Sequence, residues 1–336
     1  MASTQATSGF EIVWVETGRK ISRYLKNNIR INQEIFPTLK RNLVVDRPFM
    51  MKDSDLNVFL INELKDKIEF QHNFLTSTQV PSQKDFWFGT SFRFMALLKF
   101  MEENQARNVL HLESDCVLLN KGDIADLFST SGWELAYPLQ AEGIGCASIL
   151  LIRNTDSLRN FCEFMKKRTE DEFIDDMKLL GEYAKESNNV QLLPTSINTK
   201  SSYFYDAQSI GRYYIGTDAR NCRYPFSTRG LLDLRNKSLA NELENEILEI
   251  KQDHTGEIRI KSRRGQSCLV NIHIHSKRIP SSHIRLLRVV RKSLQAKRST
   301  FWRIGTLDLI VFAERSIDYL ARRISLLSSY KGKRLR

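Results

Sequence analysis

The stretch Asn108-Val-Leu-His-Leu-Glu-Ser-Asp-Cys-Val-Leu-Leu119 decides the fold that we expect for the whole chain. Its first apolar residues predict a buried strand, and Val117 to Leu119 predict a second one. Two carboxylates, Glu113 and Asp115, interrupt the apolar run. In an open α/β sheet, ligands bind at strand ends, and carboxylate oxygens there suit a hard divalent cation. The alternative interpretation is a solvated turn between two strands.

Positive charge is concentrated at the C-terminal end of this 336-residue chain. The net charge is +12, yet residues 277–336 alone hold 16 Lys and Arg against 3 Asp and Glu, so the remainder is nearly neutral. The length suits one large α/β domain or two smaller ones. A nearly neutral body with a cationic appendage predicts an anionic partner for the appendage, whether a membrane, a nucleic acid or an acidic protein.

Cysteine usage and the N-terminal residues indicate an intracellular protein. The five cysteines are scattered and lack the spacings of zinc sites or disulfide frameworks, which favours a reducing compartment. We expect Cys116 and Cys146 to be small core residues rather than nucleophiles. The first residues do not resemble a secretory signal, and no apolar run reaches the roughly 18 to 20 residues of a membrane span. We therefore expect a cytoplasmic location, with peripheral binding to the cytoplasmic face of a membrane as an option.

The N-terminal part predicts a β-α-β unit. Strands are expected over 11–15 and 42–46, with an amphipathic segment over 21–35 between them. Strand-helix alternation favours a parallel sheet. The turn Glu16-Thr17-Gly18 suits the nucleotide side of a ligand site, although the chain has no G-x-G-x-x-G spacing at this turn.

Alternating elements continue along the rest of the chain. Helical spacing is found over 54–70, 86–101, 123–128, 156–167 and 169–185, and strands are predicted over 133–137, 147–152 and 190–194. Gly143 and Gly145 either let the backbone approach a ligand or mark a bulge before a strand. Residues 203–218 suggest a ligand-lining loop and helix, and 247–260 predict a hairpin.

Three groups of polar residues accompany the acidic strand end. Arg93, in the aromatic helix, could bind a phosphate, hold a carboxylate through two hydrogen bonds or simply lie at the surface. Asp175 and Asp176 are adjacent in a predicted helix, where neighbours point about 100° apart, so at most one should face a cleft. Along 269–277, strict alternation puts Asn271, His273 and His275 on one face. Histidines there could lie at the surface or complete a metal shell begun by carboxylates.

The tail is expected to be helical from Ser281 onward. Arg285, Arg288 and Lys292 share one face, opposite an apolar stripe of Leu287, Val290 and Leu294. The stripe could pack on the preceding domain, or the helix could lie on anionic lipid.

Taken in order, these features resemble the nucleotide-sugar glycosyltransferases of the GT-A type, which carry a DxD or ExD metal motif. The resemblance rests on the aromatic helix with Arg93, the Glu113-Ser-Asp115 strand end, the Gly-Ile-Gly strand entrance, the Asp-Asp-Met segment and the His-Ile-His-Ser-Lys segment ending at Lys277. Glu113-Ser-Asp115 departs from a strict Asp-x-Asp. The implied fold is α/β, a Rossmann-like, mostly parallel central sheet flanked by helices. The implied division is a flexible terminus over 1–9, a catalytic domain over 10–277 and a basic amphipathic helical tail over 278–336.

The resemblance also implies a hexosyltransferase-like activity and roles for individual residues. The donor would be a nucleoside diphosphate sugar, uridine-linked, held by Mn²⁺ or Mg²⁺, and the acceptor would be a glycan, polysaccharide or lipid-linked molecule. The implied metal ligands are Asp115, Glu113 and His273 or His275. The implied donor contacts are Val15, Glu16, Thr17, Asp46, Arg93, Glu113, Ser114 and Lys277. If the reaction inverts configuration, Asp175, Asp176 or Asp206 would deprotonate the acceptor.

Two other functions compete with this interpretation. A sugar nucleotidyltransferase also places acids on a Rossmann-like sheet, but the chain lacks its Gly-rich, basic N-terminal phosphate loop. A non-enzymatic basic protein would bind a membrane or nucleic acid through the tail. The tail has few aromatic residues among its basic ones, Trp302 and Tyr330 being the best placed, so nucleic acid is the least favoured partner.

Overall fold

A computed structural model describes residues 9–17, 21–48, 56–61, 84–170, 173–195, 201–211, 247–253, 257–262, 265–275, 277 and 279–296. The helices are α1 (Arg23–Ile35), α3 (Lys84–Asn104), α4 (Ile124–Ser129), α5 (Thr155–Arg168), α6 (Asp176–Glu186) and α8 (His283–Ala296). The strands are β1 (Glu11–Glu16), β2 (Arg41–Val45), β3 (Leu56–Leu60), β4 (Val109–Leu112), β5 (Cys116–Leu118), β6 (Leu135–Ala141), β7 (Ile144–Gly145), β8 (Ile149–Ile152), β9 (Val190–Leu193), β10 (Tyr203–Tyr205), β11 (Ile247–Gln252), β12 (Ile258–Ser262) and β13 (Gly265–His273).

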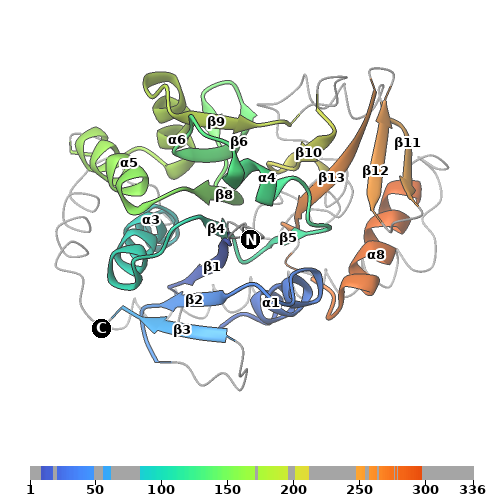
Figure 1. Ribbon diagram of the computed structural model, residues 1–336, viewed down its shortest axis with the longest axis horizontal. Helices are drawn as coiled ribbons and strands as arrows, with labels where there is room; N and C mark the ends of the chain where they lie inside the picture. Colours follow the sequence, from blue (N-terminus) through green and yellow to red (C-terminus); the bar gives the residue numbers. More distant parts are fainter. Residues whose placement is uncertain are drawn as a thin grey trace, which may run out of the picture.

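The larger of two sheets has the order β3-β2-β1-β4-β8-β6-β7, with β9 also paired to β6 (Figure 1). β1, β2, β3 and β4 run parallel, and β9 runs parallel to β6. The remaining pairs, β4 with β8 and β6 with β8 and β7, are antiparallel. The prediction of an α/β fold with a mostly parallel sheet flanked by helices is confirmed.

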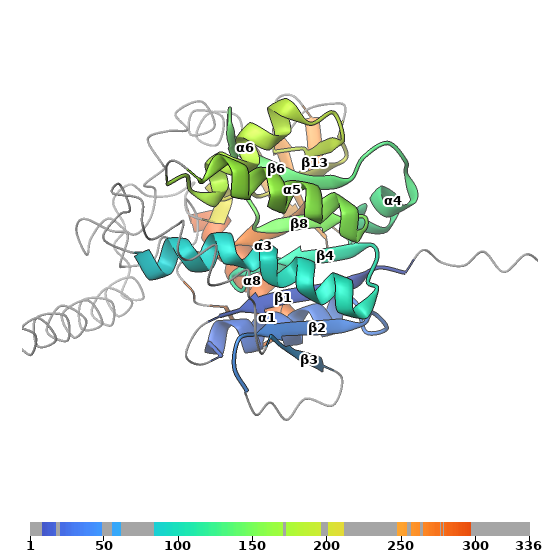
Figure 2. The same ribbon diagram turned by 90° about the vertical axis from the view of Figure 1, so that its left-hand side faces the viewer.

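Side chains alternate between two apolar cores on the two faces of this sheet. In β1, Ile12 and Trp14 belong to one core, together with residues of α1, β5, β13 and α8. Val13 belongs to the other core, with residues of α3, α5 and α6. Figure 2 shows α3 and α5 in front of the sheet, and α1 lies on the opposite side in Figure 1. Helices on both faces explain why the central strands are almost entirely apolar.

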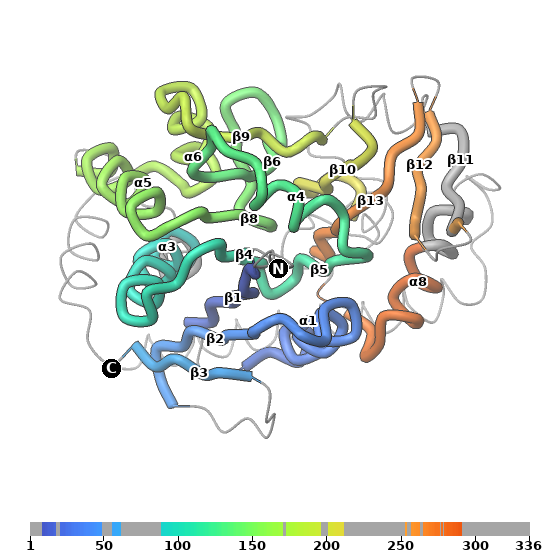
Figure 3. Tube along the Cα trace, in the orientation of Figure 1, coloured from blue at the N-terminus to red at the C-terminus, as the bar shows by residue number. Residues whose placement is uncertain are grey.

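The smaller sheet has the order β10-β13-β12-β11, and β5 also pairs with β13 (Figure 3). β11 and β12 form the antiparallel hairpin that the sequence predicts. β5 follows β4 after only three residues, yet it pairs in this sheet and not in the larger one. The acidic turn therefore connects the two sheets.

Two sequence predictions are wrong in the described residues, and a third is partly wrong. Instead of helix, 56–60 forms β3, because Leu56 to Leu60 pair in register with β2, and this long-range pairing overrides the local spacing. The helix expected from residue 169 begins at Asp176 instead. The Thr169 hydroxyl donates to the Met165 and Lys166 carbonyls and ends α5 there. The loop and helix expected over 203–218 are only partly wrong: 203–205 form β10, 206–208 are irregular and 209–211 begin a helical turn, while 212–218 lie outside the described residues.

The glycines before β8 pack against a helix. A Cβ on Gly145 would lie 2.4 Å from Leu180 Cβ of α6, and one on Gly181 would lie 2.0 Å from the Gly143 carbonyl oxygen. A register irregularity between Leu139 and Ala141 accompanies the β6–β7 pairing. Close approach is therefore required here, and α6 is the element that approaches.

The first part of the basic tail is helical and packs on the rest of the protein. α8 contacts α1 and β11, and Leu286 and Val290 are fully buried in the core that also contains α1 residues. Arg285 and Arg288 are exposed. Residues 297–336 lie outside the described residues, and the predicted boundary after residue 277 stays a prediction. No helix in the described part of the chain is both long and apolar enough to cross a bilayer.

Candidate metal and donor site

The carboxyl ends of β1, β2 and β4 meet at one edge of the larger sheet. Because these strands are parallel and in register, Glu16 ends β1 opposite Val45, and the acidic turn begins where β4 ends at Leu112. Asp46, Glu113 and Asp115 follow directly. Strand ends of this kind are where open α/β sheets bind ligands. The four carboxylates thus come from three neighbouring strands.

Asn28 of α1 anchors the acidic turn through its side chain. Its side-chain amide donates to the carbonyl oxygens of Glu113 and Ser114, each at 3.2 Å, and of Cys116 at 2.7 Å. Asn28 is fully buried, and the Cys116 backbone amide closes the turn onto the Glu113 carbonyl. The carboxylates are therefore carried on a backbone with little freedom to rearrange.

His273, at the end of β13, lies between the two carboxylates of the turn. Its Nε2 is 3.2 Å from Glu113 Oε2 and 3.2 Å from Asp115 Oδ1. Its Nδ1 is 3.1 Å from the Ala207 carbonyl oxygen, which can only accept, so Nδ1 carries a hydrogen. In the doubly protonated ring, Nε2 carries a second proton and donates it to the two carboxylates. In the neutral ring, Nε2 directs a lone pair at two negatively charged groups, which is favourable only with a cation between the ring and the acids.

The charges at this position shift the pKa of all three groups. Burial lowers the pKa of His273, but Asp115 and Glu113 outweigh it, and the net pKa is well above its ordinary value. Burial raises the pKa of Asp115, but His273 and Lys277 outweigh it and hold the pKa well below its usual range. Burial also raises the pKa of Glu113, but Arg93 and His273 outweigh burial, and the net pKa is below its ordinary value. Both carboxylates are therefore ionised, as metal ligands must be.

Asp115, His273 and His275 can present one ligand atom each within 4.8 Å of one another. All three residues are buried, and the two imidazole rings stack with centroids 4.1 Å apart. One carboxylate and two imidazoles form a donor set that suits first-row divalent ions, and a second carboxylate, Glu113, adjoins it. With the orientation of His273 fixed through Nδ1, the residues present fit a divalent metal.

Lys277 also reaches the cluster, from a tight turn just after β13. Its ammonium donates to Asp115 Oδ2 and lies 5.4 Å from the centre of the Tyr24 ring. Burial lowers the pKa of Lys277, but Asp115 outweighs it, and the net pKa is raised. This side chain is 29% exposed, whereas that of Asp115 is 5% exposed. Lys277 is therefore charged and lies at the edge of the site that opens to solvent.

Arg93 connects α3, the acidic turn and α6. Its guanidinium donates to Glu113 Oε1 and, at 2.5 Å, to Asp176 Oδ2. Burial lowers the pKa of Arg93, but Glu113 and Asp176 outweigh it, and the net pKa is raised. Of the options for this arginine, the structure has the one in which it holds carboxylates, but it donates one hydrogen bond to each of two carboxylates rather than two to one. One oxygen of Glu113 thus faces Arg93 and the other faces His273.

The three carboxylates that could deprotonate an acceptor lie in different surroundings. Asp175 caps α6, accepting a hydrogen bond from the Lys178 backbone amide at 2.9 Å, while Asp176 pairs with Arg93. Asp206 is buried, and its carboxylate accepts three backbone hydrogen bonds, from Ile210, Gly211 and His273. Asp206 therefore orders the loop that follows β10 and fixes the end of β13.

The remaining expected donor contacts lie along β1, β2 and the acidic turn. Val15, Glu16 and Thr17 are partly buried at the end of β1, and Ser114 is partly buried in the turn. Burial raises the pKa of Glu16 to about 7, with Lys277 opposing and Asp115 and Asp46 adding to the rise. Asp46 pairs with the neighbouring Arg47 at 3.2 Å. These residues border the same edge as the metal cluster, and Gly18 lies outside the described residues.

Comparison with known proteins yields likenesses of fold only. No protein-family model and no curated protein matches the sequence. Among solved structures, the chain is similar to galactosyltransferase LgtC in complex with donor and acceptor sugar analogs, with 14% identity and a TM-score of 0.39 over 56% of this chain and 74% of that one. Mouse xyloside xylosyltransferase 1 gives 10% identity and a TM-score of 0.40 over 56% and 87%, respectively. A cytidylyltransferase from Leptospira borgpetersenii gives 12% and 0.32 over 55% and 75%. At these TM-scores the likenesses carry no argument about activity.

The sequence predicts no role for the residues that support the site, although it places Asn271 on the same strand face as His273 and His275. Asn28 and Asn271 are fully buried amides; Asn271 binds both backbone groups of Asp206 and the Cys116 thiol. A Cβ on Gly211 would lie 1.9 Å from the His273 carbonyl oxygen, so this position needs glycine. An asparagine on the apolar face of 21–35 was the available signal for Asn28. Cys116 and Cys146 are buried free thiols, as predicted.

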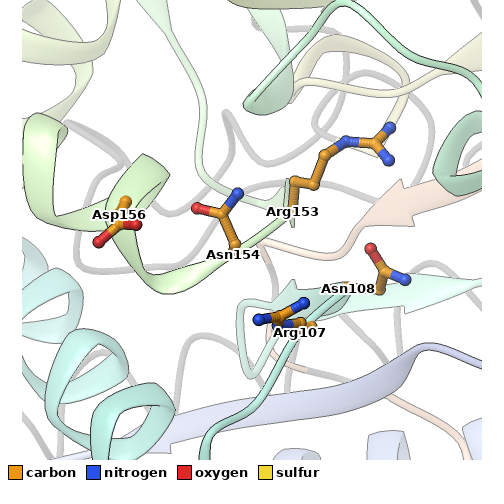
Figure 4. Close-up of a pocket in the computed structure, with 5 residues that line it drawn as sticks. All are labelled: Arg107, Asn108, Arg153, Asn154 and Asp156. Atoms are coloured by element: carbon orange, nitrogen blue, oxygen red, sulfur yellow. The ribbon is translucent and has the colours of Figure 1, made fainter.

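A separate pocket of about 420 Å³ lies at the opposite edge of the sheet (Figure 4). Arg107 and Asn108 precede β4, whereas Arg153, Asn154 and Asp156 come from the end of β8 and the start of α5. The Arg153 guanidinium donates to backbone carbonyls near α4 and stacks on Trp133. This pocket is remote from the carboxylates, and Arg153 is part of the packing around α4.

Proposed function

We propose that the protein is a metal-dependent glycosyltransferase with the GT-A fold, which transfers a sugar from a nucleoside diphosphate sugar to a glycan, polysaccharide or lipid-linked acceptor. The observation that carries the proposal is the convergence of Asp115, His273 and His275, with Glu113 beside them, at the carboxyl edge of parallel strands. A buried acid-imidazole set at this edge suits a cation that would in turn bind an anionic ligand.

Each residue of the cluster has a role in this proposal. Asp115, His273, His275 and Glu113 would hold Mn²⁺ or Mg²⁺. The bound ion would neutralise the charge that develops on the leaving diphosphate. Val15, Glu16, Thr17 and Asp46 would border the nucleoside, uridine in our proposal, Ser114 would lie against the donor, and Lys277 would contact the diphosphate. Arg93 would orient Glu113 through their shared hydrogen bond.

The surroundings of the candidate bases favour retention of configuration. An inverting enzyme needs a carboxylate that accepts the acceptor's proton. Asp206 is held by three backbone amides, Asp175 caps α6, and Asp176 pairs with Arg93. A retaining reaction relies on positioning and electrostatic stabilisation, which the cluster is suited to provide.

We further propose that the basic tail brings the protein to an anionic surface at the cytoplasmic face of a membrane, where polysaccharide precursors are assembled. Support comes from the 16 Lys and Arg against 3 Asp and Glu in residues 277–336 and from the exposure of Arg285 and Arg288 on α8.

The deciding experiment measures nucleotide binding and donor hydrolysis by the full chain. Purified protein is titrated with UDP in the presence of Mn²⁺, and a panel of nucleotide sugars is tested for hydrolysis. We expect Asp115→Asn to abolish both, while the matched control Asp156→Asn, whose side chain is 81% exposed, leaves both unchanged. If no nucleotide sugar is turned over and Asp115→Asn binds UDP as the wild type does, the proposal is wrong. Release of pyrophosphate from a nucleoside triphosphate and a sugar 1-phosphate would favour a nucleotidyltransferase instead.

A further inference from the structure

We propose that Lys277 takes the place of the metal on Asp115 when the metal is absent, so that ion binding and the Lys277–Asp115 pair exclude each other. The inference rests on the proposed function and adds a regulatory step to the same site. Metal binding would release the Lys277 ammonium, which would then be available to an anionic donor. Metal and nucleotide would therefore bind in that order.

Both oxygens of Asp115 are already engaged in this arrangement. Oδ1 lies 3.2 Å from His273 Nε2, and Oδ2 accepts from Lys277. Asp115 is only 3% exposed, and a cation on either of its oxygens would place a second positive charge beside the Lys277 ammonium on the same buried carboxylate. The ion and the ammonium therefore compete for Asp115.

Of the two partners, Lys277 is the one that can leave. His273 is anchored by its Nδ1 contact with Ala207 and by stacking on His275, and it is itself a candidate ligand. Lys277 has a long side chain that is 29% exposed and no second hydrogen-bonded anchor among the contacts of its ammonium in the described residues. Moving it requires only side-chain rotation.

The surroundings also provide a place for the displaced ammonium. The Tyr24 ring is 5.4 Å away, and the charge of Lys277 acts on the nearby carboxyl of Glu16. The backbone need not move: Lys277 has a positive φ of 58°, and its amide donates to the Ile274 carbonyl at 2.9 Å. A tight turn therefore fixes the residue beside the ligands while its side chain exchanges partners.

The test compares Mn²⁺ binding, by calorimetry without nucleotide, in the full-length wild type and in Lys277→Met. We expect the variant to bind Mn²⁺ roughly tenfold more tightly, because the ion no longer has to displace a charged hydrogen bond. Binding of UDP to the Mn²⁺-loaded variant should weaken, because the released ammonium is missing. The control is Lys40→Met, which removes a 52% exposed lysine paired with Glu11 and should change neither affinity. Unchanged or weaker Mn²⁺ binding by Lys277→Met overturns the inference.

A second measurement uses only the wild type and does not depend on how the variant folds. The Lys277 amine is acetylated by a limiting reagent with and without Mn²⁺, and mass spectrometry compares its rate with that of Lys40. We expect a several-fold faster modification of Lys277 alone when Mn²⁺ is present, and equal rates contradict the exchange. If Mn²⁺ binds and Asp115→Asn abolishes that binding while Lys277 shows no change, only this inference fails. If the wild type binds no Mn²⁺, the proposed metal site fails with it.

Discussion

The side-chain amide of Asn32 donates a hydrogen bond to Oδ1 of Asn28 at 2.6 Å. This contact fixes which end of the Asn28 amide faces the acidic turn, because the oxygen is already used one helical turn away. The nitrogen is then directed at the carbonyls of Glu113, Ser114 and Cys116. Two asparagines on the buried face of α1 therefore set the position of the carboxylates.

We predict that Asn28→Leu destabilises the protein by about 2–4 kcal/mol, because leucine cannot donate to the three carbonyl oxygens of the acidic turn, of which the Glu113 carbonyl keeps the Cys116 amide. Urea denaturation measures the loss. The control, Asn104→Ala, removes an asparagine whose amide donates to the Phe100 carbonyl in its own helix and should cost less than about 1 kcal/mol. Equal stability of the two variants would show that water replaces the Asn28 amide without cost.

Replacing Arg93 should cost more than replacing any exposed arginine. Arg93→Met leaves Glu113 and Asp176 buried without their common partner, and we expect a loss of about 3–5 kcal/mol. Arg159 forms a comparable pair of contacts with Glu102 and Asp156, but at the surface, and Arg159→Met should cost about 1 kcal/mol or less. Unfolding of both variants in guanidinium chloride gives the comparison. Similar losses would contradict the importance of the Arg93 pair.

His111 makes the fold sensitive to mild acid. Burial and, to a smaller extent, the charge of Arg93 together lower its pKa from 6.5 to about 4. Between these values the unfolded chain binds a proton that the folded chain does not, so stability is complete above pH 6.5 and falls as the pH falls to 4. The loss is about 1.4 kcal/mol per pH unit, or about 3 kcal/mol in total. His111→Leu should remove this component, and parallel stability curves from pH 7 to 4 would refute the prediction.

Gly181→Ala and Gly89→Ala should change the free energy of unfolding in opposite directions. A Cβ on Gly181 would lie 2.0 Å from the Gly143 carbonyl oxygen, which is backbone, so α6 must move and about 1–3 kcal/mol is lost. On Gly89 of α3 the nearest atom is 3.6 Å away, and alanine should stabilise the helix by about 0.5–1 kcal/mol. Thermal unfolding distinguishes them. A neutral Gly181→Ala would mean that α6 does not depend on this contact.

Local patterns were sufficient to predict the strands that end at the site. Apolar runs predicted β1, β2 and β4, strict alternation predicted β13, and the position of two acids at a strand end predicted the edge where ligand groups gather. The aromatic helix and the option that Arg93 binds carboxylates were also readable from residue types. The roles of these residues in catalysis or binding stay predictions.

Contacts between distant segments could not be predicted from one sequence. Asn28 and the acidic turn are more than 80 residues apart, and nothing in the spacing of either connects them. The contact between Asp206 and His273 could not be predicted either: the carboxylate of Asp206 accepts hydrogen bonds from backbone amides, including that of His273. β3 has a local pattern that also suits a helix, and only its pairing with β2 decides between them.

The connection between the two sheets has a mechanical consequence for the carboxylates. The Glu113 amide donates to Ser148 beside the larger sheet, whereas the Asp115 carbonyl accepts from Ile274, just past the end of β13 in the smaller one. The spacing between the two acids therefore depends on how the sheets are inclined to each other. A substitution under α8 that tilts the smaller sheet would therefore move Asp115 relative to Glu113, and we expect it to change the affinity of the proposed metal site while leaving each proposed ligand in place.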